Sequence, residues 1–199
     1  LDSITDSLHM SATTREALCD AALTLFAEQG IESTATREIA EKAGVAEGTL
    51  YRHFESKEEL VQCLFDNSAR RFYEVLQQAT ADDPPPRDQL QALVRGVFAF
   101  AEAYPTAFTY LLSVHHTGIL EERENPPPPM RLFVDTLTEG IDQGSFRSLS
   151  PVLATGWIVA MAQRAVVLRS SPLMTDSREA VIQETVHAAL RLVDAADPQ

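Results

Sequence analysis

The chain has 199 residues, enough for one large domain or two small ones, and 45% of them are hydrophobic, so it can bury an ordinary core without disulfides or metals. The 16 Lys and Arg against 29 Asp and Glu give a net charge of −13, which on its face argues against a nucleic-acid partner. No uninterrupted apolar run reaches the roughly 18 residues of a membrane span. We therefore expect a cytoplasmic protein with no membrane partner.

The first residues and the two cysteines are predicted to carry no function. Residues 1–9 lack helical periodicity and Met10 follows a histidine, as at an expression-vector junction. Residues 1–11 are therefore predicted to be a disordered leader or an expression remnant. Cys19 and Cys63 cannot form a disulfide framework, and because each lies among helical apolar residues, each is predicted to be a reduced core thiol.

Helical periodicity dominates the first part of the chain. Thr13 with Glu16, and Ser56 with Glu59, form capping boxes at two helix starts. Gly30 supplies a residue that tolerates the left-handed conformation after a helix. Thr34 is predicted to cap the second helix and Gly44 to end it. The predicted helices span residues 13–30, 34–43, 47–54 and 56 toward 76.

Two proline-rich breaks, residues 82–86 and 125–129, divide the remainder. Helical stripes predict further helices over residues 90–101, 105–116, 130–143, 150–169 and 175–195. The helix at 150–169 is apolar nearly all round, as expected of a helix covered on more than one side, whereas the last helix is apolar on one face. The chain is therefore predicted to be all-α, with about nine helices.

Residues 31–60 carry the most informative pattern. Two short helices joined by Gly44-Val45, with small or apolar residues where they cross, are typical of a helix-turn-helix. The segment resembles the DNA-binding domain of the tetracycline-repressor (TetR) family of bacterial transcriptional regulators at Thr34, Arg37, Ile39-Ala40, Ala43-Gly44-Val45, Gly48-Thr49-Leu50-Tyr51, His53-Phe54 and Ser56-Lys57. The resemblance implies a three-helix DNA-binding domain at residues 12–72 and a larger helical ligand-binding and dimerisation domain at 73–199.

The second short helix has one face available to DNA. Because successive residues turn by about 100°, Leu50 and Phe54 point to the core and Gly48, Thr49 and Arg52 lie opposite. Gly48 permits close backbone approach, Thr49 can meet a phosphate or a thymine methyl, and Arg52 can reach guanine or phosphate. The alternative is an ordinary solvated polar face. The other predicted DNA contacts, mainly to phosphates, are Tyr51, His53, Lys57, Thr34 and Thr36, with Arg37 added by the resemblance.

Two residues depart from the family's usual pattern. Ala46 stands where a capping serine is common, which removes a cap worth about 1 kcal/mol. Glu47 stands where a basic or neutral residue is common; it suits a helix N-terminus but repels phosphate, unless it accepts from a cytosine amino group. Both departures bear on operator sequence and affinity rather than on the motif.

The distribution of charge changes the meaning of the total. Residues 36–57 carry four basic and four acidic side chains, so the rest of the chain carries the whole net charge of −13. Lys42 and Lys57 are the only lysines of the sequence. Without a broad basic field, DNA binding is expected to rest on a few aimed contacts.

The second domain is expected to pair and to bind a ligand. By the resemblance, the helices at 150–169 and 175–195 form a homodimer interface, and an all-round apolar helix independently needs a cover. An aromatic-rich set is predicted to line an effector pocket, with plain core packing as the alternative: Phe98, Tyr104, Phe108, Tyr110, Leu112, Phe133, Trp157 and Met161. His115 and His116 point about 100° apart and make poor paired metal ligands, so no metal is predicted.

The predicted function is a repressor that binds double-stranded operator DNA and is released by a small apolar or aromatic effector, without cofactor or catalytic residues. One alternative is a small-molecule-binding helical protein with weakened DNA binding, for which Ala46 and Glu47 are the hint. The other is a helical-bundle enzyme, for which Glu184 and His187 supply only one of the two Glu-x-x-His pairs that a di-metal site needs.

Overall fold

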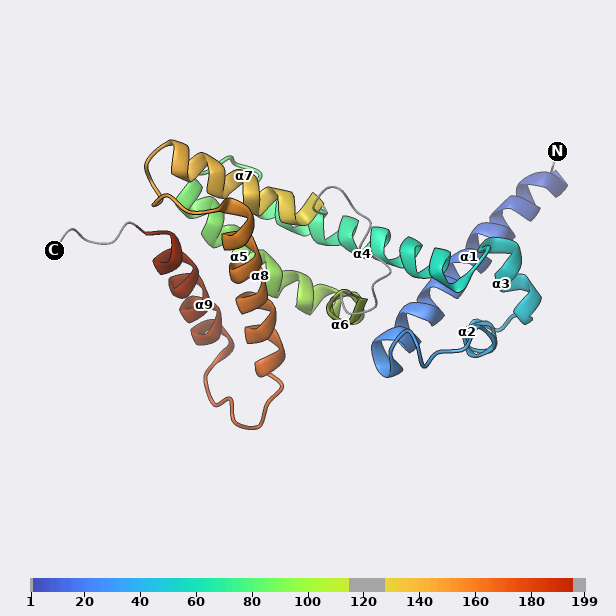
Figure 1. Ribbon diagram of the computed structural model, residues 1–199. Helices are drawn as coiled ribbons and strands as arrows, with labels where there is room; N and C mark the ends of the chain where they lie inside the picture. Colours follow the sequence, from blue (N-terminus) through green and yellow to red (C-terminus); the bar gives the residue numbers. More distant parts are fainter. Residues whose placement is uncertain (1, 115–127, 195–199) are drawn as a thin grey trace. The chain divides into compact units, whose positions relative to one another are not determined.

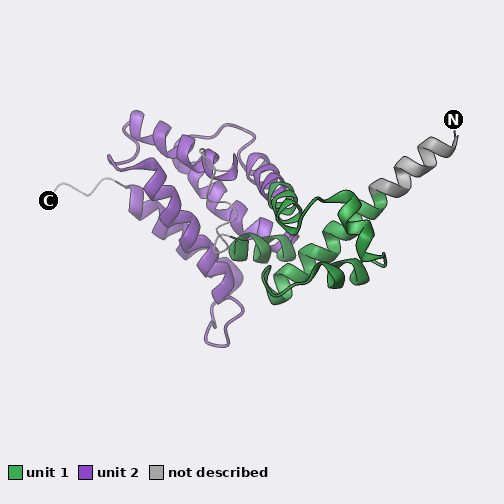
Figure 2. Cartoon of the chain, turned by 45° about the vertical axis from the view of Figure 1, so that its right-hand side comes forward, with its two compact units in different colours: residues 1–68, 105–124 green, residues 69–104, 125–199 purple. Residues whose placement is uncertain are grey.

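The computed structural model describes the backbone of residues 2–114 and 128–194, with side chains from residue 13 onward. Every regular element in these ranges is a helix, and nine helices lie within them, which confirms the all-α prediction (Figure 1). The chain divides into two compact units, coloured separately in Figure 2. Unit 1 comprises the residues up to Ser68 together with the segment that begins at Pro105, and unit 2 comprises the rest.

Unit 1 contains α1 (Asp2–Gln29), α2 (Thr36–Lys42), α3 (Glu47–His53), the first half of α4 (Lys57–Ala79) and α6 (Pro105–Val114). Helix α1 packs against α2, α3 and α6. Its apolar stripe supplies Leu18, Ala22 and Phe26 to the core, and all three are fully buried. The ring of Phe26 stacks on Tyr110 of α6, whose hydroxyl donates to the carbonyl oxygen of Val61 at 2.7 Å.

The helix starts differ in part from the prediction. Helix α1 begins at Asp2 and runs through the predicted capping box at Thr13, because no proline or glycine in residues 2–12 interrupts it. Helix α2 has Ala35, not Thr34, at its N-cap, and Glu38 accepts from the Ala35 N–H at 2.9 Å. The predicted cap of α4 is confirmed, since Ser56 Oγ accepts from the Glu59 N–H at 3.1 Å.

Unit 2 is a helical bundle built around α5 (Pro86–Ala103). Helix α5 packs against α7 (Pro128–Asp142), α8 (Pro151–Leu168) and α9 (Arg178–Val193), and α8 also packs against α7 and α9. Serines cap α8 and α9: Ser150 accepts from the Leu153 N–H and Ser177 from the Ala180 N–H. At the end of α7 the chain turns so tightly that a methyl group on Gly140 would lie 2.1 Å from the Phe146 ring.

The division into units departs from the predicted boundary at residue 72. The units divide between Ser68 and Ala69, inside α4, and α6 belongs to unit 1. Helix α4 continues through the division because its sequence contains neither glycine nor proline. The contacts of Tyr110 with Phe26 and Val61 explain why α6 belongs with the first unit.

Salt bridges tie the ends of α5, α8 and α9 together. Glu102 at the end of α5 accepts from Arg169 after α8 at 3.0 Å and from Arg178 at the start of α9 at 2.5 Å. The hydrogen bond from Arg178, together with that from Arg169, holds the pKa of Glu102 below its ordinary value. One carboxylate therefore fixes both ends of the α8–α9 connection to α5.

Helix α8 buries one face and exposes an apolar one. Ala154, Ile158 and Ala162 are completely buried, whereas Trp157 is 49% exposed. The exposed stripe is apolar except at Arg164 and consists of Val152, Leu153, Gly156, Trp157, Ala160, Arg164 and Val167. By length and composition alone α8 could cross a membrane, although Gln163 and Arg164 interrupt its apolar run. Its buried face packs on three neighbouring helices, which favours a protein surface.

Candidate functional site

A tight turn in unit 1 joins α2 to α3. Gly44 follows α2 with a φ of 72°, a left-handed conformation that favours glycine, and the Val45 N–H donates to the Ala40 carbonyl at 2.9 Å. Ile39 of α2 and Leu50 of α3 are completely buried, so each helix turns one apolar face to α1 and its neighbours. The opposite face of α3 is thereby left to solvent.

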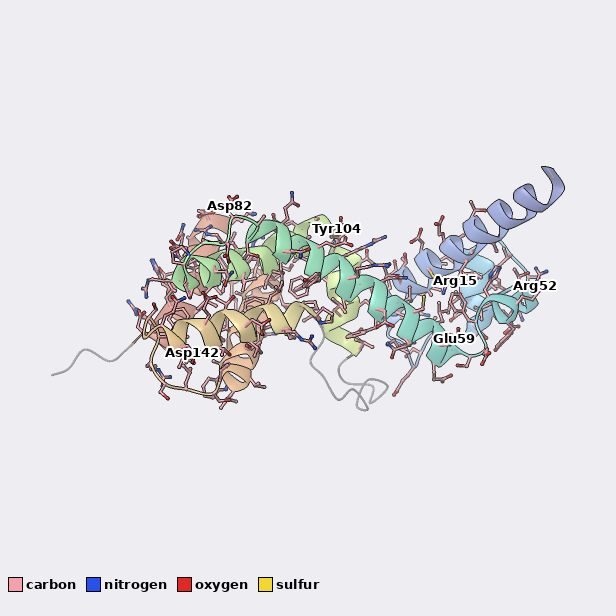
Figure 3. All side chains as sticks on the ribbon, turned by 90° about the horizontal axis from the view of Figure 1, so that it is seen from above. Arg15, Arg52, Glu59, Asp82, Tyr104 and Asp142 are labelled. Carbon is pink, nitrogen blue, oxygen red and sulfur yellow. The ribbon has the colours of Figure 1, made fainter. Side chains whose placement is uncertain are left out.

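The exposed face of α3 has the composition that the sequence predicts. Gly48 and Arg52 are exposed and Thr49 is half-buried. The Arg52 guanidinium donates to Thr49 Oγ1 at 3.2 Å, and its side chain lies on the outer surface of unit 1 (Figure 3). A methyl group on Gly48 would meet no atom of the protein within 4 Å. The surface at Gly48 is therefore open to an approaching backbone.

A hydroxyl cluster links α2 to α3. Thr36 at the start of α2 donates to Glu47 Oε1 at 2.9 Å, and its hydroxyl lies 3.2 Å from that of Tyr51. Tyr51 is 52% exposed. The Glu47 carboxylate, which the sequence leaves as an unpaired departure from the family pattern, is thus held by a neighbouring helix. Local periodicity cannot reveal this contact because it joins two different helices.

The basic residues predicted to contact phosphates are placed differently from one another. Arg37 is exposed and pairs with Glu41 at 2.8 Å within α2, and this hydrogen bond raises the pKa of Arg37. Lys57 is half-buried, with its ammonium 5.9 Å from the centre of the Phe26 ring. His53 is half-buried at the end of α3. Of these three side chains, Arg37 is the most accessible.

Thr34 does not lie where the sequence predicts. Its side chain is buried, its hydroxyl donates to the Gly30 carbonyl at 2.8 Å and it accepts from Gln29 Nε2 at 3.2 Å. Both hydrogen-bonding functions of the hydroxyl are therefore used inside the protein, where Thr34 secures the connection from α1 to α2. The Thr34 hydroxyl is therefore not available to a phosphate.

The residues predicted to line the effector pocket are divided between the two units. Phe98 and Phe133 are completely buried in unit 2, Met161 is half-buried there, and Tyr104 and Trp157 are exposed. The remaining three, Phe108, Tyr110 and Leu112, belong to unit 1 with α6. The eight residues therefore form no common lining within either unit, because the sequence pattern could not show which unit α6 would join.

Unit 2 has a depression lined mainly by polar and charged residues, unlike the aromatic pocket that the sequence predicts. Its volume is about 610 Å³, it lies at the end of α4, and none of the predicted pocket residues lines it. The lining residues are Glu74, Gln77, Gln78, Thr80, Ala81 and Asp83. These side chains do not suit an apolar effector.

Helix α8 contributes one buried polar group that the sequence analysis missed. Thr155 Oγ1 is buried and has no hydrogen-bond partner among the described residues. Buried hydroxyls are nearly always paired, and an unpaired one costs about 1–3 kcal/mol. A threonine on a helix that otherwise buries alanine and isoleucine is the only sequence signal of this position.

The described part of the chain holds no group of three or more His, Cys, Asp or Glu side chains close enough to bind a metal ion. Glu184 and His187, which suggested half of a di-metal site, are exposed on α9. His115 and His116 lie outside the described residues.

Comparisons with known proteins identify the family. Residues 18–64 match the model of the bacterial regulatory proteins of the tetR family. The HTH-type transcriptional repressor KstR2 of Mycolicibacterium smegmatis is 31% identical over 153 residues, which cover 71% of this chain and 72% of the repressor. The structure of the ketosteroid transcriptional regulator KstR2 of Mycobacterium tuberculosis aligns with a TM-score of 0.67 and 25% identity, over 92% of this chain and 95% of that one.

The transcriptional regulator FadR from Bacillus subtilis, solved in complex with stearoyl-CoA, has the same fold, with a TM-score of 0.72 and 21% identity over 88% of this chain and 97% of that one. The family model covers the helix-turn-helix, and the KstR2 repressor extends the similarity beyond it. The chain therefore belongs to the TetR family of bacterial regulatory proteins, whose members bind DNA as transcription regulators and are not enzymes.

Proposed function

We propose that the chain is a homodimeric transcriptional repressor that reads operator DNA with α3 and is released from it by a small-molecule effector. The exposed face of α3 carries the proposal. Gly48 and Arg52 are exposed on this seven-residue helix, while Leu50 behind them is completely buried. Such a helix can enter a major groove without disturbing its own core.

The side chains around α3 divide into two roles. Thr49 and Arg52, already hydrogen-bonded to each other, would present a hydroxyl and a guanidinium to base edges at the point where Gly48 lets the backbone approach. Phosphates would be contacted by Tyr51, Arg37, His53 and Lys57, whereas Thr36 already donates its one hydroxyl proton to Glu47. Arg37 would exchange Glu41 for a phosphate, a stronger anionic partner in a DNA complex.

Dimerisation is assigned to α8 and α9, which correspond to the last two helices expected from the sequence. The exposed stripe of α8 is apolar, and a second copy of the chain offers an identical surface to cover it. The exposed face of α9 carries Glu184, His187 and Arg191. Opposite charges on one helix face complement each other when two copies pair antiparallel. The two α3 helices would then read half-sites about 34–36 Å apart, or a multiple of that spacing.

The effector is assigned to unit 2. A regulator of the same fold was solved with stearoyl-CoA, which supports a small molecule with a large apolar part. The unpaired hydroxyl of Thr155 supports a binding position beside α8, because a polar atom of the effector would give it the partner that it lacks among the described residues. Binding of effector and operator would weaken each other by the same factor.

The DNA-reading role is tested by Arg52→Ala. We expect a loss of about 1–3 kcal/mol in operator binding, roughly ten- to a hundredfold, because a bidentate contact is removed. The measurement is fluorescence anisotropy with a DNA fragment from upstream of the protein's own gene. Arg95→Ala is the matched control, since Arg95 pairs with Glu179 in unit 2. If the wild type binds no DNA even at low salt, the chain is instead a small-molecule-binding protein with weakened DNA binding.

The effector position is tested by Thr155→Val, with stearoyl-CoA as the probe and coenzyme A as its control. The substitution removes the unpaired hydroxyl and keeps the shape of the side chain. We expect unchanged operator affinity without effector, and a rise of about five- to tenfold in the stearoyl-CoA concentration that releases half of the DNA.

Thr185→Val is the matched control for this substitution, because Thr185 is also buried but already donates to the Val181 carbonyl at 2.7 Å. An equal effect of both variants on release would argue against Thr155 as an effector contact.

A further inference from the structure

Two cysteines that the sequence analysis treats as separate core thiols lie together in unit 1. Cys19 on α1 and Cys63 on the first half of α4 are both free and half-buried. Cys19 lies one turn after Arg15 on α1, and Arg15 donates to the sulfur of Cys63 at 3.1 Å, so one face of α1 turns both residues toward Cys63. Because neither residue is fully buried, the pair lies near enough to solvent for a small solute to approach it.

Two donors converge on the sulfur of Cys63. Arg15, labelled in Figure 3, donates from Nη2 to Cys63 Sγ at 3.1 Å, and Asn67 Nδ2 lies 3.6 Å from the same sulfur. Arg15 lies one turn before Cys19 on α1, and Asn67 one turn after Cys63 on α4, so two helix faces build the site together. A charged donor stabilises a thiolate sulfur more than a thiol sulfur.

The two thiols have different surroundings. Burial raises the pKa of the Cys19 thiol to about 12, and the neighbouring Cys63 adds to the increase, so Cys19 remains protonated at neutral pH. Partial burial alone would lower the pKa of Arg15, but its hydrogen bond to Cys63 and the charge of that sulfur raise it on balance. The Arg15 guanidinium therefore associates with Cys63, whereas Cys19 keeps its proton.

We propose that Cys63 reacts with hydrogen peroxide and that Cys19 resolves its oxidised form into an intramolecular disulfide. The Cys63 sulfur attacks one oxygen of hydrogen peroxide; an S–O bond forms, the O–O bond breaks, and the departing hydroxide takes up the proton that the Cys63 thiol releases, which gives water. The sulfur is oxidised to a sulfenic acid by two electrons. Cys19 then attacks this sulfur, the S–S bond forms, and the hydroxyl leaves with the Cys19 proton as a second water.

A disulfide between Cys19 and Cys63 would join the two helices that flank the helices proposed to bind DNA. Helix α1 packs on α2 and α3, and α4 begins shortly after α3 ends. An S–S bond of about 2.05 Å is shorter than any non-bonded sulfur contact, so it draws α1 and α4 together and takes the acceptor from Arg15. The effect on DNA rests on the proposed function, whereas the thiol chemistry does not. We expect the cross-linked protein to bind operator about tenfold more weakly.

The experiment treats the reduced full-length protein with one equivalent of hydrogen peroxide, blocks remaining thiols with N-ethylmaleimide and maps the peptides by mass spectrometry. The expected result is loss of both thiols and one peptide pair that joins Cys19 to Cys63 within a single chain. Cys19→Ser should stop at a sulfenic acid on Cys63 that dimedone captures, and Cys63→Ser should suppress the reaction at Cys19. Far-ultraviolet circular dichroism checks that both variants are folded.

Arg15→Gln tests the built part of the site. We expect the reaction with peroxide to slow by about three- to tenfold, because the charged donor to Cys63 is removed. Arg95→Gln, which removes an arginine of unit 2 paired with Glu179, should leave the rate unchanged.

Reaction no faster than that of the urea-unfolded chain, first oxidation at Cys19, or linkage between chains would each overturn the proposal. Operator binding is measured on the reduced and the cross-linked protein side by side. Binding by the reduced protein supports the proposed function on its own, and an unchanged affinity after complete cross-linking would overturn the regulatory role of the pair.

Discussion

The exposed faces of α3 and α8 differ in chemistry although both helices bury their other face. On α3 the exposed side chains are polar and hydrogen-bonded, as in the Arg52–Thr49 contact. On α8 they are apolar apart from Arg164, with Trp157 at the centre of the stripe, 49% exposed. A buried face stabilises its own unit, so the chemistry of the remaining face indicates the partner. Polar groups with an open glycine suit DNA, and an apolar stripe suits a second protein surface.

The largest effect is expected from a charge on the α8 stripe. Trp157→Glu would place a carboxylate in an apolar interface, and an unpaired buried charge of this kind costs several kcal/mol. We expect the dissociation constant of the dimer to rise at least 100-fold. Operator binding should fall with it, because a single protomer makes too few contacts with DNA. Sedimentation velocity and fluorescence anisotropy measure the two quantities.

Leu173→Glu is the control for the charge itself, since Leu173 is 90% exposed and lies outside the α8 stripe. If the Trp157→Glu variant remained a dimer at submicromolar concentration, the exposed face of α8 would not be the dimer interface. That face would then need another partner, such as a membrane or an unrelated protein.

A matched pair of glycines sharpens the comparison. Gly48 on α3 and Gly156 on α8 are both helical, and a methyl group on either meets no atom within 4 Å. Alanine at each should raise the free energy of unfolding of the isolated chain by about 0.5–1 kcal/mol. We expect Gly48→Ala to weaken operator binding by about tenfold and to leave dimerisation unchanged, because only DNA approaches that surface.

Gly156→Ala should do the reverse, changing the dimer dissociation constant by about tenfold and leaving intact the contacts of each α3 helix. Chemical denaturation, sedimentation and DNA titration on the two variants separate these outcomes. If Gly48→Ala changed the dimer dissociation constant, the assignment of DNA binding to α3 and of dimerisation to α8 would be wrong.

The smallest effect concerns the carboxylate that holds the ends of α8 and α9. Because its pKa is lowered in the folded protein, Glu102 contributes stability above the ordinary pKa of a glutamate, and this contribution is lost as the pH falls through the lowered value. Solvent screens the pair, so Glu102→Gln should reduce the free energy of unfolding by less than about 1 kcal/mol at pH 7.

The difference between wild type and Glu102→Gln should disappear in acid, below the folded pKa. Urea denaturation at neutral and acidic pH measures it. Operator binding at pH 7 should not change, since none of the side chains assigned to DNA contacts Glu102; a loss of DNA binding would show that α3 depends on the α8–α9 end of unit 2.

Local pattern predicted most of the helices and the face of α3. Leu50 and Phe54 are buried where their helical spacing places them, and Gly48 and Arg52 are exposed opposite. The prediction worked because a short amphipathic helix has one way to bury its apolar residues. Serine caps were also predictable at α4, since the hydroxyl and the N–H that it accepts from are three residues apart.

Contacts between distant segments could not be predicted. Thr34 was expected at the surface, but a side chain from α1, Gln29, covers its hydroxyl. The pairing of Cys19 with Cys63 depends on how α1 packs against α4, which no spacing reveals. The unit to which the aromatic residues of α6 belong could not be predicted for the same reason. Helical periodicity shows which face of a helix is apolar but not which core that face packs into.

The contact of Thr36 with Glu47 has a consequence for the thermodynamics of recognition. A carboxylate on a groove-facing helix is electrostatically unfavourable near phosphates, yet here it restrains α3 against α2 before any DNA arrives. Side chains that are ordered in advance lose less conformational entropy on association, about 0.5–1.5 kcal/mol for each. Glu47 thus adds a small enthalpic disadvantage near phosphates but orders α3 in advance. Operator binding by this protein should therefore show a smaller entropic penalty than the neutral charge balance of residues 36–57 alone suggests.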